Sequence, residues 1–292
     1  MLRTKEIAFR AANAALISGI SLLHRSFGVD ATYKIGAGKA CAEFEGCWFA
    51  YHPAEFGCTG NLDFYPEAEN KTRHALFEMV MPGQVFYDIG AHGGVYSITL
   101  QKRFPALKIH SFEPQPEDLL ANLALNDMQA DNVHAVAVGE RAGTVAMTTK
   151  HRSSNHVSEA GDRSVPMVTL DQYVAERNLP PPDWIKIDIE GLELPALRGA
   201  KSLLAAHHPN IICEINHLYG RFGTKLADFM SFLDSLGYDV FKLAQDGFSR
   251  VAKSDNLADL GYSADNNFWF VHRDQSGHLA APVDRAERSG TI

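Results

Sequence analysis

The sequence predicts one α/β domain built on a mostly parallel sheet. Apolar segments of strand length alternate with amphipathic segments of helix length from residue 67 to residue 272, which is the pattern of βαβ units. Two apolar runs, 184–189 and 210–215, suit strands that are buried on both faces. A third run, 84–89, opens into a glycine-rich turn and a helix-forming segment, which indicates a loop for a nucleotide-type cofactor.

The predicted elements follow one another along the chain. Residues 5–25 predict a helix, and residues 32–52, whose apolar positions are interrupted by glycines, predict short antiparallel strands. A helix over 67–80 ends at a Pro-Gly pair. Seven strands are then predicted, at 84–89, 108–113, 132–138, 184–189, 210–216, 238–243 and 267–272. Helices fit between most of them, at 95–104, 116–127, 170–177, 193–206 and 224–236.

The polar segment 143–168 interrupts this alternation, and we interpret it as a hairpin or flap inserted between the third and fourth core strands. We divide the chain into an N-terminal extension of a helix and short strands (1–66), the α/β domain (67–275) and a flexible C-terminal tail (276–292). The 292 residues and the 46% hydrophobic content are enough for one large core.

Charge and metal-ligand spacing exclude several classes of function. The net charge of −8 and the pI near 5.9 argue against binding nucleic acid through a broad basic face. The histidines form no H-E-x-x-H or H-x-x-x-H pair, and the cysteines form no C-x-x-C pair, so we expect no structural zinc site. We expect free thiols in a reducing, cytoplasmic compartment, with one disulfide among Cys41, Cys47 and Cys58 as the alternative. Cys213 lies in an apolar run and is expected in the core.

The N-terminal segment allows two interpretations. Residues 11–23 carry no charge and follow three basic residues, but they are too short to span a bilayer, which takes about 20 residues. No small-x-small cleavage site follows them. We favour a helix that packs on the domain or on a partner. The alternative is an amphipathic helix over 5–24 that lies in a membrane surface and makes the protein membrane-peripheral.

The glycine-rich turn, with Gly90 and Gly93, is the candidate cofactor loop. Glu113 lies 23 residues beyond Gly90 at the end of the second strand, where a carboxylate can accept hydrogen bonds from both ribose hydroxyls. Its alternative role is that of a solvated loop acid. NAD would favour a G-x-G-x-x-G loop, which is absent here. Asp88 instead favours the cationic groups of S-adenosylmethionine, unless it only caps the turn.

The end of the fourth strand carries the candidate catalytic acids. Asp188 and Glu190 are two residues apart, so on a strand they share a face at the edge where ligands bind. Two neighbouring carboxylates raise the proton affinity of one of them, so one could act as a base. Alternatively, the two together could bind a hard cation. Lys186 either neutralises one acid or reaches solvent. Glu193 lies just before a proline and suits the first turn of a helix. We give a structural role for Glu193 the same weight as a role in the site.

The fifth strand ends with Glu214 and His217, which we expect to line the same edge and to face the acceptor. His217 is a candidate base, although a lone histidine in such a place is more often packed or solvated. His151 and His156 of the flap are expected to face solvent. We expect that the site binds no metal. In the alternative case, Asp188, Glu190 and Glu214 would together offer oxygen ligands to a cation.

Five segments together resemble a known family. They are 88–94 (Asp-Ile-Gly-Ala-His-Gly-Gly), 112–114 (Phe-Glu-Pro), 169–171 (Thr-Leu-Asp), and 185–191 (Ile-Lys-Ile-Asp-Ile-Glu-Gly) with Arg-Gly-Ala at 198–200. In this order they are similar to the FkbM family of S-adenosylmethionine-dependent methyltransferases, over residues 70 to 272. The resemblance implies a Rossmann-like class I methyltransferase fold, a seven-stranded sheet whose last strand is antiparallel. The family commonly has Asn where this chain has His92, which puts a family side-chain contact at 92 in doubt. Residues 1–65 are not covered.

We therefore predict an S-adenosylmethionine-dependent O-methyltransferase. Its acceptor would be a hydroxyl on a sugar, a glycan or another small polar metabolite. The alternatives are an NAD-linked oxidoreductase on the same kind of sheet and a non-catalytic scaffold that keeps the fold. The predicted catalytic residues are Asp188, Glu190 and His217. The predicted cofactor-binding residues are Asp88, Gly90, Ala91, His92, Gly93, Tyr96, Glu113 and Asp188.

Overall fold

The computed structural model describes residues 33–36, 39–51, 66–149, 157–158, 161–215, 220, 223–244, 247–251 and 266–275. The predicted helix over 5–25 and the predicted tail over 276–292 lie outside these residues, and so does His217. Across the described part of the chain, no helix combines the length and the apolar character needed to cross a membrane.

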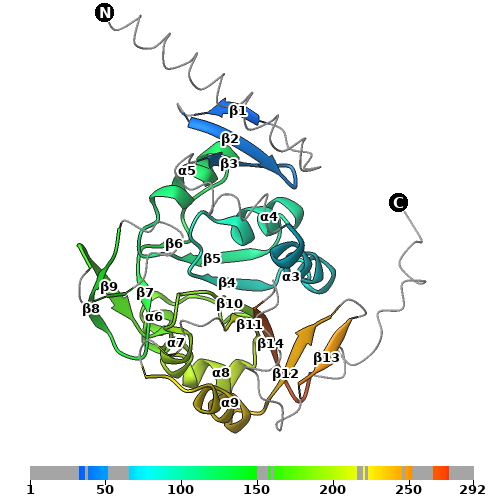
Figure 1. Cartoon of the computed structure of the whole chain (residues 1–292), viewed down its shortest axis with the longest axis vertical. Helices are drawn as coiled ribbons and strands as arrows, with labels where there is room; N and C mark the ends of the chain where they lie inside the picture. Colours follow the sequence, from blue (N-terminus) through cyan, green and yellow to red (C-terminus); the bar gives the residue numbers. More distant parts are fainter. Residues whose placement is uncertain are drawn as a thin grey trace, which may run out of the picture.

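The described residues form a large sheet of eight strands in the order β13-β12-β14-β11-β10-β4-β5-β6 (Figure 1). Its strands are β4 (Val85–Ile89), β5 (Lys108–Phe112), β6 (Val133–His134), β10 (Trp184–Ile187), β11 (Asn210–Glu214), β12 (Tyr238–Leu243), β13 (Phe248–Arg250) and β14 (Asn267–His272). The pairs from β11 to β6 are parallel, and β14 is antiparallel to both β11 and β12. The predicted Rossmann-like sheet with an antiparallel last strand is confirmed, and β13 extends its edge by an eighth strand.

Helices cover both faces of this sheet (Figure 1). On one face, α3 (Pro66–Met79) and α4 (Val95–Arg103) pack on the strands through an apolar cluster centred on Phe86, Trp184 and Trp269. On the other face, α6 (Leu170–Arg177), α7 (Glu193–Arg198), α8 (Lys201–His207) and α9 (Leu226–Ser235) surround a second cluster. Side chains on successive strand residues alternate between the two clusters, so both faces of β4 and β10 are buried, as the apolar runs predict.

Two predicted elements are each divided in the structure. The predicted strand over 132–138 is β6 and then β7 (Ala137–Val138), and β7 belongs to a different sheet. The break is a tight turn in which Val136 N donates to His134 O at 2.9 Å. The predicted helix over 193–206 is α7 and α8, interrupted at 199–200. Gly199 lies so close to the chain at Gly139 that a Cβ on it would be 2.1 Å from the Gly139 carbonyl oxygen.

The predicted hairpin between the third and fourth core strands is confirmed. It consists of β8 (Gly143–Met147) and β9 (Arg163–Val168), which pair antiparallel, while β7 pairs with β9 in parallel. The resulting three-stranded sheet stands beside the large one in Figure 1. Its flap residues His151 and His156 are outside the described residues.

The predicted short N-terminal strands are also confirmed. They are β1 (Tyr33–Gly36), β2 (Lys39–Phe44) and β3 (Cys47–Tyr51), which form an antiparallel meander. The strand β3 lies against α4 and α5 (Glu117–Leu125). Cys41, Cys47 and Cys213 are buried free thiols, as expected, while Cys58 is outside the described residues.

Candidate functional site

The glycine loop after β4 has a backbone that only glycine fits at its first position. Gly90 has φ 80°, and a Cβ on it would lie 1.9 Å from the carbonyl oxygen of Asp188. The N–H groups of Gly90 and Ala91 both donate to Phe112 O at the end of β5. The loop is therefore held between the ends of β5 and β10, at the carboxyl edge of the sheet, where parallel α/β folds bind ligands.

Glu113 fastens the loop from the β5 side. Its carboxylate accepts the N–H of His92 on one oxygen and the N–H of Gln115 on the other, both at 2.9 Å. Partial burial raises the pKa of Glu113 to about 7, although the two N–H groups oppose that shift. A carboxylate oxygen accepts more than one hydrogen bond, so Glu113 can hold the loop and still accept from ligand hydroxyls. His92 is exposed and has φ 47°.

Asp88 is directed into the protein. It is 1% exposed, and its Oδ2 accepts the N–H and the hydroxyl of Ser97 in the first turn of α4, the latter at 2.6 Å. The Ser97 hydroxyl is also 2.7 Å from the hydroxyl of Ser111 on β5. Burial raises the pKa of Asp88, and Lys186 opposes the shift. The structure thus favours the capping role for Asp88, which fixes the start of α4 behind the loop, over direct contact with a ligand.

Lys186 lies beside Asp88 in the strand register and is 4% exposed. Its Nζ donates to Asp188 Oδ2 at 3.1 Å and lies 4.7 Å from the centre of the Tyr96 ring. Of the two sequence interpretations, Lys186 therefore neutralises an acid and does not reach solvent. Tyr96 is 5% exposed and belongs to the apolar cluster that α3 and α4 form with the sheet.

Asp188 and Glu214 form a carboxyl pair at the ends of two adjacent parallel strands. The register that pairs Ile187 with Cys213 brings them side by side, and their side chains hydrogen bond to each other. The charge of Asp188, followed by burial, raises the pKa of Glu214 well above its usual range. Burial alone would raise the pKa of Asp188, but Lys186 and the bond from Glu214 outweigh it and lower that pKa. The raised pKa makes Glu214 the member of the pair that carries the shared proton, and Glu214 donates a hydrogen bond to the Asp188 carboxylate.

The turn after β10 differs from the prediction. The strand ends at Ile187, and Glu190 has φ 57°, so strand alternation does not extend to Glu190 and cannot put it on the face of Asp188. Glu193 is 4% exposed, and its Oε1 accepts the N–H groups of Ile189 and Gly191 at 3.2 and 2.9 Å. The structural role considered for Glu193 is confirmed: it holds the acid-bearing turn in place. Burial raises the pKa of Glu193 to about 7.

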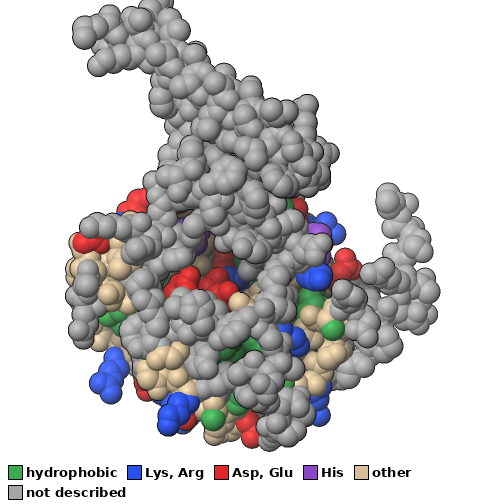
Figure 2. Space-filling model, viewed as in Figure 1, with side chains coloured by type: hydrophobic (Ala, Val, Ile, Leu, Met, Phe, Trp, Pro, Cys, Tyr) green, Lys and Arg blue, Asp and Glu red, His purple; other side chains and the backbone are tan. Residues whose placement is uncertain are grey.

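The structure thus brings four predicted positions to one edge, namely Gly90, Glu113, Asp188 and Glu214. Acidic side chains gather near the centre of the face seen in Figure 2, with a basic side chain beside them. Sequence reasoning missed Ser97, which donates to Asp88, and Ser111, whose hydroxyl lies beside that of Ser97. The strand register could have indicated Ser111, which is paired with Asp88 across β4 and β5.

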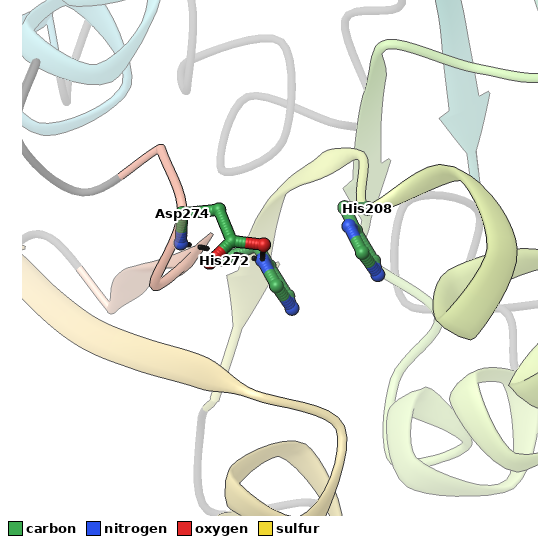
Figure 3. Close-up of side chains that lie close together, drawn as sticks. All are labelled: His208, His272 and Asp274. Atoms are coloured by element: carbon green, nitrogen blue, oxygen red, sulfur yellow. Dashed lines mark hydrogen bonds and ion pairs between the residues drawn. The ribbon is translucent and has the colours of Figure 1, made fainter.

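A second group of potential ligand side chains lies at the opposite, amino-terminal edge of β11. It consists of His208, His272 and Asp274, whose ligand atoms lie within 4.8 Å of one another. Figure 3 shows the two imidazoles face to face; their ring centres are 3.6 Å apart and their planes differ by 2°. Ring lone pairs lie in the ring planes, so in parallel rings they do not converge on one ion. A Cβ at Gly237 would also lie 2.6 Å from His272 Nε2. We interpret the group as a stacked histidine pair rather than a metal site.

Comparison with known proteins identifies the family. The Methyltransferase FkbM domain matches residues 88–240, which is more than half of the chain. The 31-O-demethyl-FK506 methyltransferase FkbM of Streptomyces tacrolimicus is 24% identical over 214 residues, covering 60% of this chain and 76% of that protein. The hexuronic acid methyltransferase AglP of Haloferax volcanii is 23% identical over 134 residues, covering 44% of this chain and 55% of that protein.

Among solved structures, the methyltransferase FkbM from Methylobacillus flagellatus KT aligns with a TM-score of 0.46 and 18% identity. The alignment covers 73% of this chain and 52% of that chain. The family match includes the glycine loop, Glu113, Asp188 and Glu214. The chain belongs to the FkbM methyltransferase family.

Proposed function

We propose that the protein is an S-adenosylmethionine-dependent O-methyltransferase whose acceptor is a hydroxyl on a sugar, a glycan or another small polar metabolite. Two relatives support the acceptor class: one is named for methylation at an oxygen of FK506 and the other for methylation of a hexuronic acid. The observation that carries the proposal is the Asp188–Glu214 carboxyl pair beside the glycine loop. This edge of the sheet therefore combines a loop suited to a cofactor with side chains that can take up a proton.

The donor set of the loop suits S-adenosylmethionine. The loop lies between the carboxylate of Glu113 and the backbone carbonyl of Asp188, and segment 88–94 contains no Lys or Arg for a pyrophosphate. Carboxylates suit a ligand that carries ribose hydroxyls and positive charge. In the proposal, Glu113 receives the ribose, the backbone of 90–93 approaches the ligand closely, and Asp188 faces its cationic end. In the proposal, Asp88 and Tyr96 do not contact the cofactor but hold α4 in place on the sheet.

The catalytic role of the chain is to position the acceptor and to remove its proton. When bound, the cofactor supplies an electrophilic methyl group. The acceptor oxygen would become cationic as it bonds to the methyl carbon, while the bond from that carbon to the sulfonium sulfur breaks and its electron pair stays on sulfur. The oxygen would then lose its proton to a base. In the proposal, Asp188, which accepts the hydrogen bond from Glu214, takes up the proton that the acceptor loses, and the pair then passes it to solvent. A base contributes about 10²–10⁴-fold, and alignment of the reactants contributes several kcal/mol more.

Glu190 and His217 are the alternative bases. Both follow a strand of the carboxyl edge in sequence, and Glu190 interacts electrostatically with Glu214. We propose that Glu190 faces the acceptor. The ammonium of Lys186 already lies 3.1 Å from Asp188, and it supplies positive charge that a cation would otherwise provide. This contact favours metal-independent transfer.

The other two functional classes are less well supported. The family match and the absence of G-x-G-x-x-G argue against an NAD-linked oxidoreductase. The complete set of Gly90, Glu113, Asp188 and Glu214 argues against a scaffold that has lost its chemistry.

The test is a methyl-transfer assay with isotopically labelled S-adenosylmethionine and a library of hexuronic acids, neutral sugars and hydroxylated metabolites. Mass spectrometry should detect an acceptor that gains one labelled methyl group on oxygen. Asp188→Asn and Glu190→Gln should lower turnover far more than they lower affinity for S-adenosylhomocysteine. Transfer to nitrogen or carbon would contradict the O-directed assignment, and unchanged turnover in both variants would contradict the catalytic one.

A further inference from the structure

The outer edge of β3 is paired with side chains. One edge of β3 is hydrogen-bonded to β2. At the other edge lie two asparagines one helical turn apart, Asn122 of α5 and Asn126, which follows its last residue. Asn126 Oδ1 accepts the N–H of Trp48 at 2.7 Å, and its Nδ2 donates to Trp48 O at 2.7 Å. Asn122 Oδ1 accepts the N–H of Ala50 at 2.8 Å. The two amides thus bind the strand edge as a neighbouring strand would.

Asn122 also reaches the glycine loop. Its Nδ2 donates to the carbonyl oxygen of Gly93 at 2.8 Å, and the residue is 4% exposed. The next N–H, that of Gly94, donates to Ala91 O at 2.7 Å. The peptide between Gly93 and Gly94 is therefore held on both sides, by Asn122 and by the loop itself. A Cβ on Gly93 would lie 3.3 Å from Nδ2 of Asn122, so a larger residue would press on this amide.

Apolar and charged contacts dock the meander on the same surface. Cys47 and Phe49 of β3 are buried in one cluster with Ala91 of the loop and with residues of α4 and α5. At the turn between β2 and β3, Glu45 accepts from Arg73 of α3 at 3.1 Å, and Arg73 is 1% exposed. The meander is thus held at the turn and along its edge, and Asn122 receives a fixed partner.

We infer that the N-terminal meander is a working part of the cofactor site, because β3 positions Asn122 and Asn122 holds the Gly93–Gly94 peptide in the shape that receives the cofactor. Asn122 is a positioning residue in this scheme. The inference rests on the proposed use of the loop for S-adenosylmethionine. It implies that the region before the family match contributes to cofactor affinity, although no predicted ligand-binding residue lies in it.

Asn126 provides a matched control. An Asp at either position keeps the oxygen that accepts from β3 and replaces the amide donor by a second oxygen. In Asn122→Asp that oxygen faces the Gly93 carbonyl, whereas in Asn126→Asp it faces the carbonyls of Trp48 and Asn122. Both variants thus introduce the same kind of repulsion between α5 and its neighbours, but only Asn122→Asp introduces it at the glycine loop.

The experiment is calorimetric titration of the full chain with S-adenosylhomocysteine, together with thermal unfolding. Both variants should lower Tm by similar amounts. Asn122→Asp should raise the Kd by about tenfold or more, whereas Asn126→Asp should change it by less than about threefold. At saturating cofactor, kcat of Asn122→Asp should stay near that of the unmodified chain. If Asn122→Asp does not fold, Asn122→Ala should still raise the Kd several-fold, because it removes the same donor.

Wild-type affinity in Asn122→Asp or Asn122→Ala would overturn the inference. So would an equal loss of affinity in Asn126→Asp, because the effect would then not depend on the bond from Asn122 to the Gly93 carbonyl. Absence of S-adenosylhomocysteine binding to the unmodified chain is a different result. It would overturn the proposed function, and the inference with it.

Discussion

Glu214 donates a hydrogen bond to Asp188 across the ends of two adjacent parallel strands, and Lys186 donates to the same Asp188 carboxylate. Two donors therefore converge on one acid at the edge that carries the glycine loop. The charge of Asp188 is the largest cause of the raised pKa of Glu214. The pair thus combines a proton on Glu214 with an acceptor on Asp188, which gives it the capacity to exchange a proton.

Replacing Glu214 by Gln tests this capacity. The Gln amide can donate to Asp188 as the protonated Glu does, but it cannot exchange a proton. We expect turnover to fall by about tenfold or more, while the Kd for S-adenosylhomocysteine stays within about threefold. If kcat of the unmodified chain changes at alkaline pH because Glu214 loses its proton, that change should be absent from Glu214→Gln. Wild-type turnover and pH profile in Glu214→Gln would show that the pair takes no part in proton transfer.

Replacing Gly90 by Ala tests the contact between the loop and β10. The new Cβ would lie 1.9 Å from Asp188 O, so the loop or the acid-bearing turn must move. Gly83→Ala is the matched control, because Gly83 also has positive φ, 87°, but has no atom within 4 Å of the added Cβ. Both variants should lose about 1 kcal/mol of stability from backbone strain. Only Gly90→Ala should lose cofactor binding as well, measured by calorimetry. Equal effects of the two variants would contradict the contact.

Replacing Glu193 by Gln tests the pH dependence of the turn that carries Asp188. The folded-state pKa of Glu193 is raised from 4.5 to about 7, so the folded protein binds this proton more tightly than the unfolded chain does. This contribution to stability is present below about pH 4.5 and is lost as the pH rises towards 7.

Because Gln keeps the acceptor for the N–H groups of Ile189 and Gly191 and does not titrate, the stability of Glu193→Gln relative to the unmodified chain should increase over this pH range. The increase should be on the order of 2–3 kcal/mol, measured by chemical denaturation at several pH values. A difference that stays constant with pH, or that decreases as the pH rises, would contradict the account.

The parts of the fold and the site that depend on local pattern could be predicted from the sequence. The strand ends locate Glu113 and Asp188, and the register of parallel strands brings them to one edge beside Gly90. Lys186 was predicted to neutralise an acid as one of two alternatives, because it comes two residues before Asp188 on the same strand.

Other parts depend on contacts between distant segments. Asn122 and Asn126 look like ordinary polar positions of a helix, and their role depends on β3, more than 70 residues earlier in the chain. The alternation argument fails at Glu190, since the strand ends at Ile187 and the backbone turns to positive φ. The capping of α4 by Asp88 requires Ser97, which periodicity alone does not single out.

The most direct test of the account is calorimetric titration of the full chain with S-adenosylhomocysteine and, separately, with NAD⁺. The glycine loop between Glu113 and Asp188 should bind S-adenosylhomocysteine at one site per chain. Glu113→Ala should weaken that binding clearly because it removes the acceptor for His92 N and the group proposed to receive the ribose. NAD⁺ should give no binding heat. Binding of NAD⁺ together with no response to S-adenosylhomocysteine or S-adenosylmethionine would contradict the central claim.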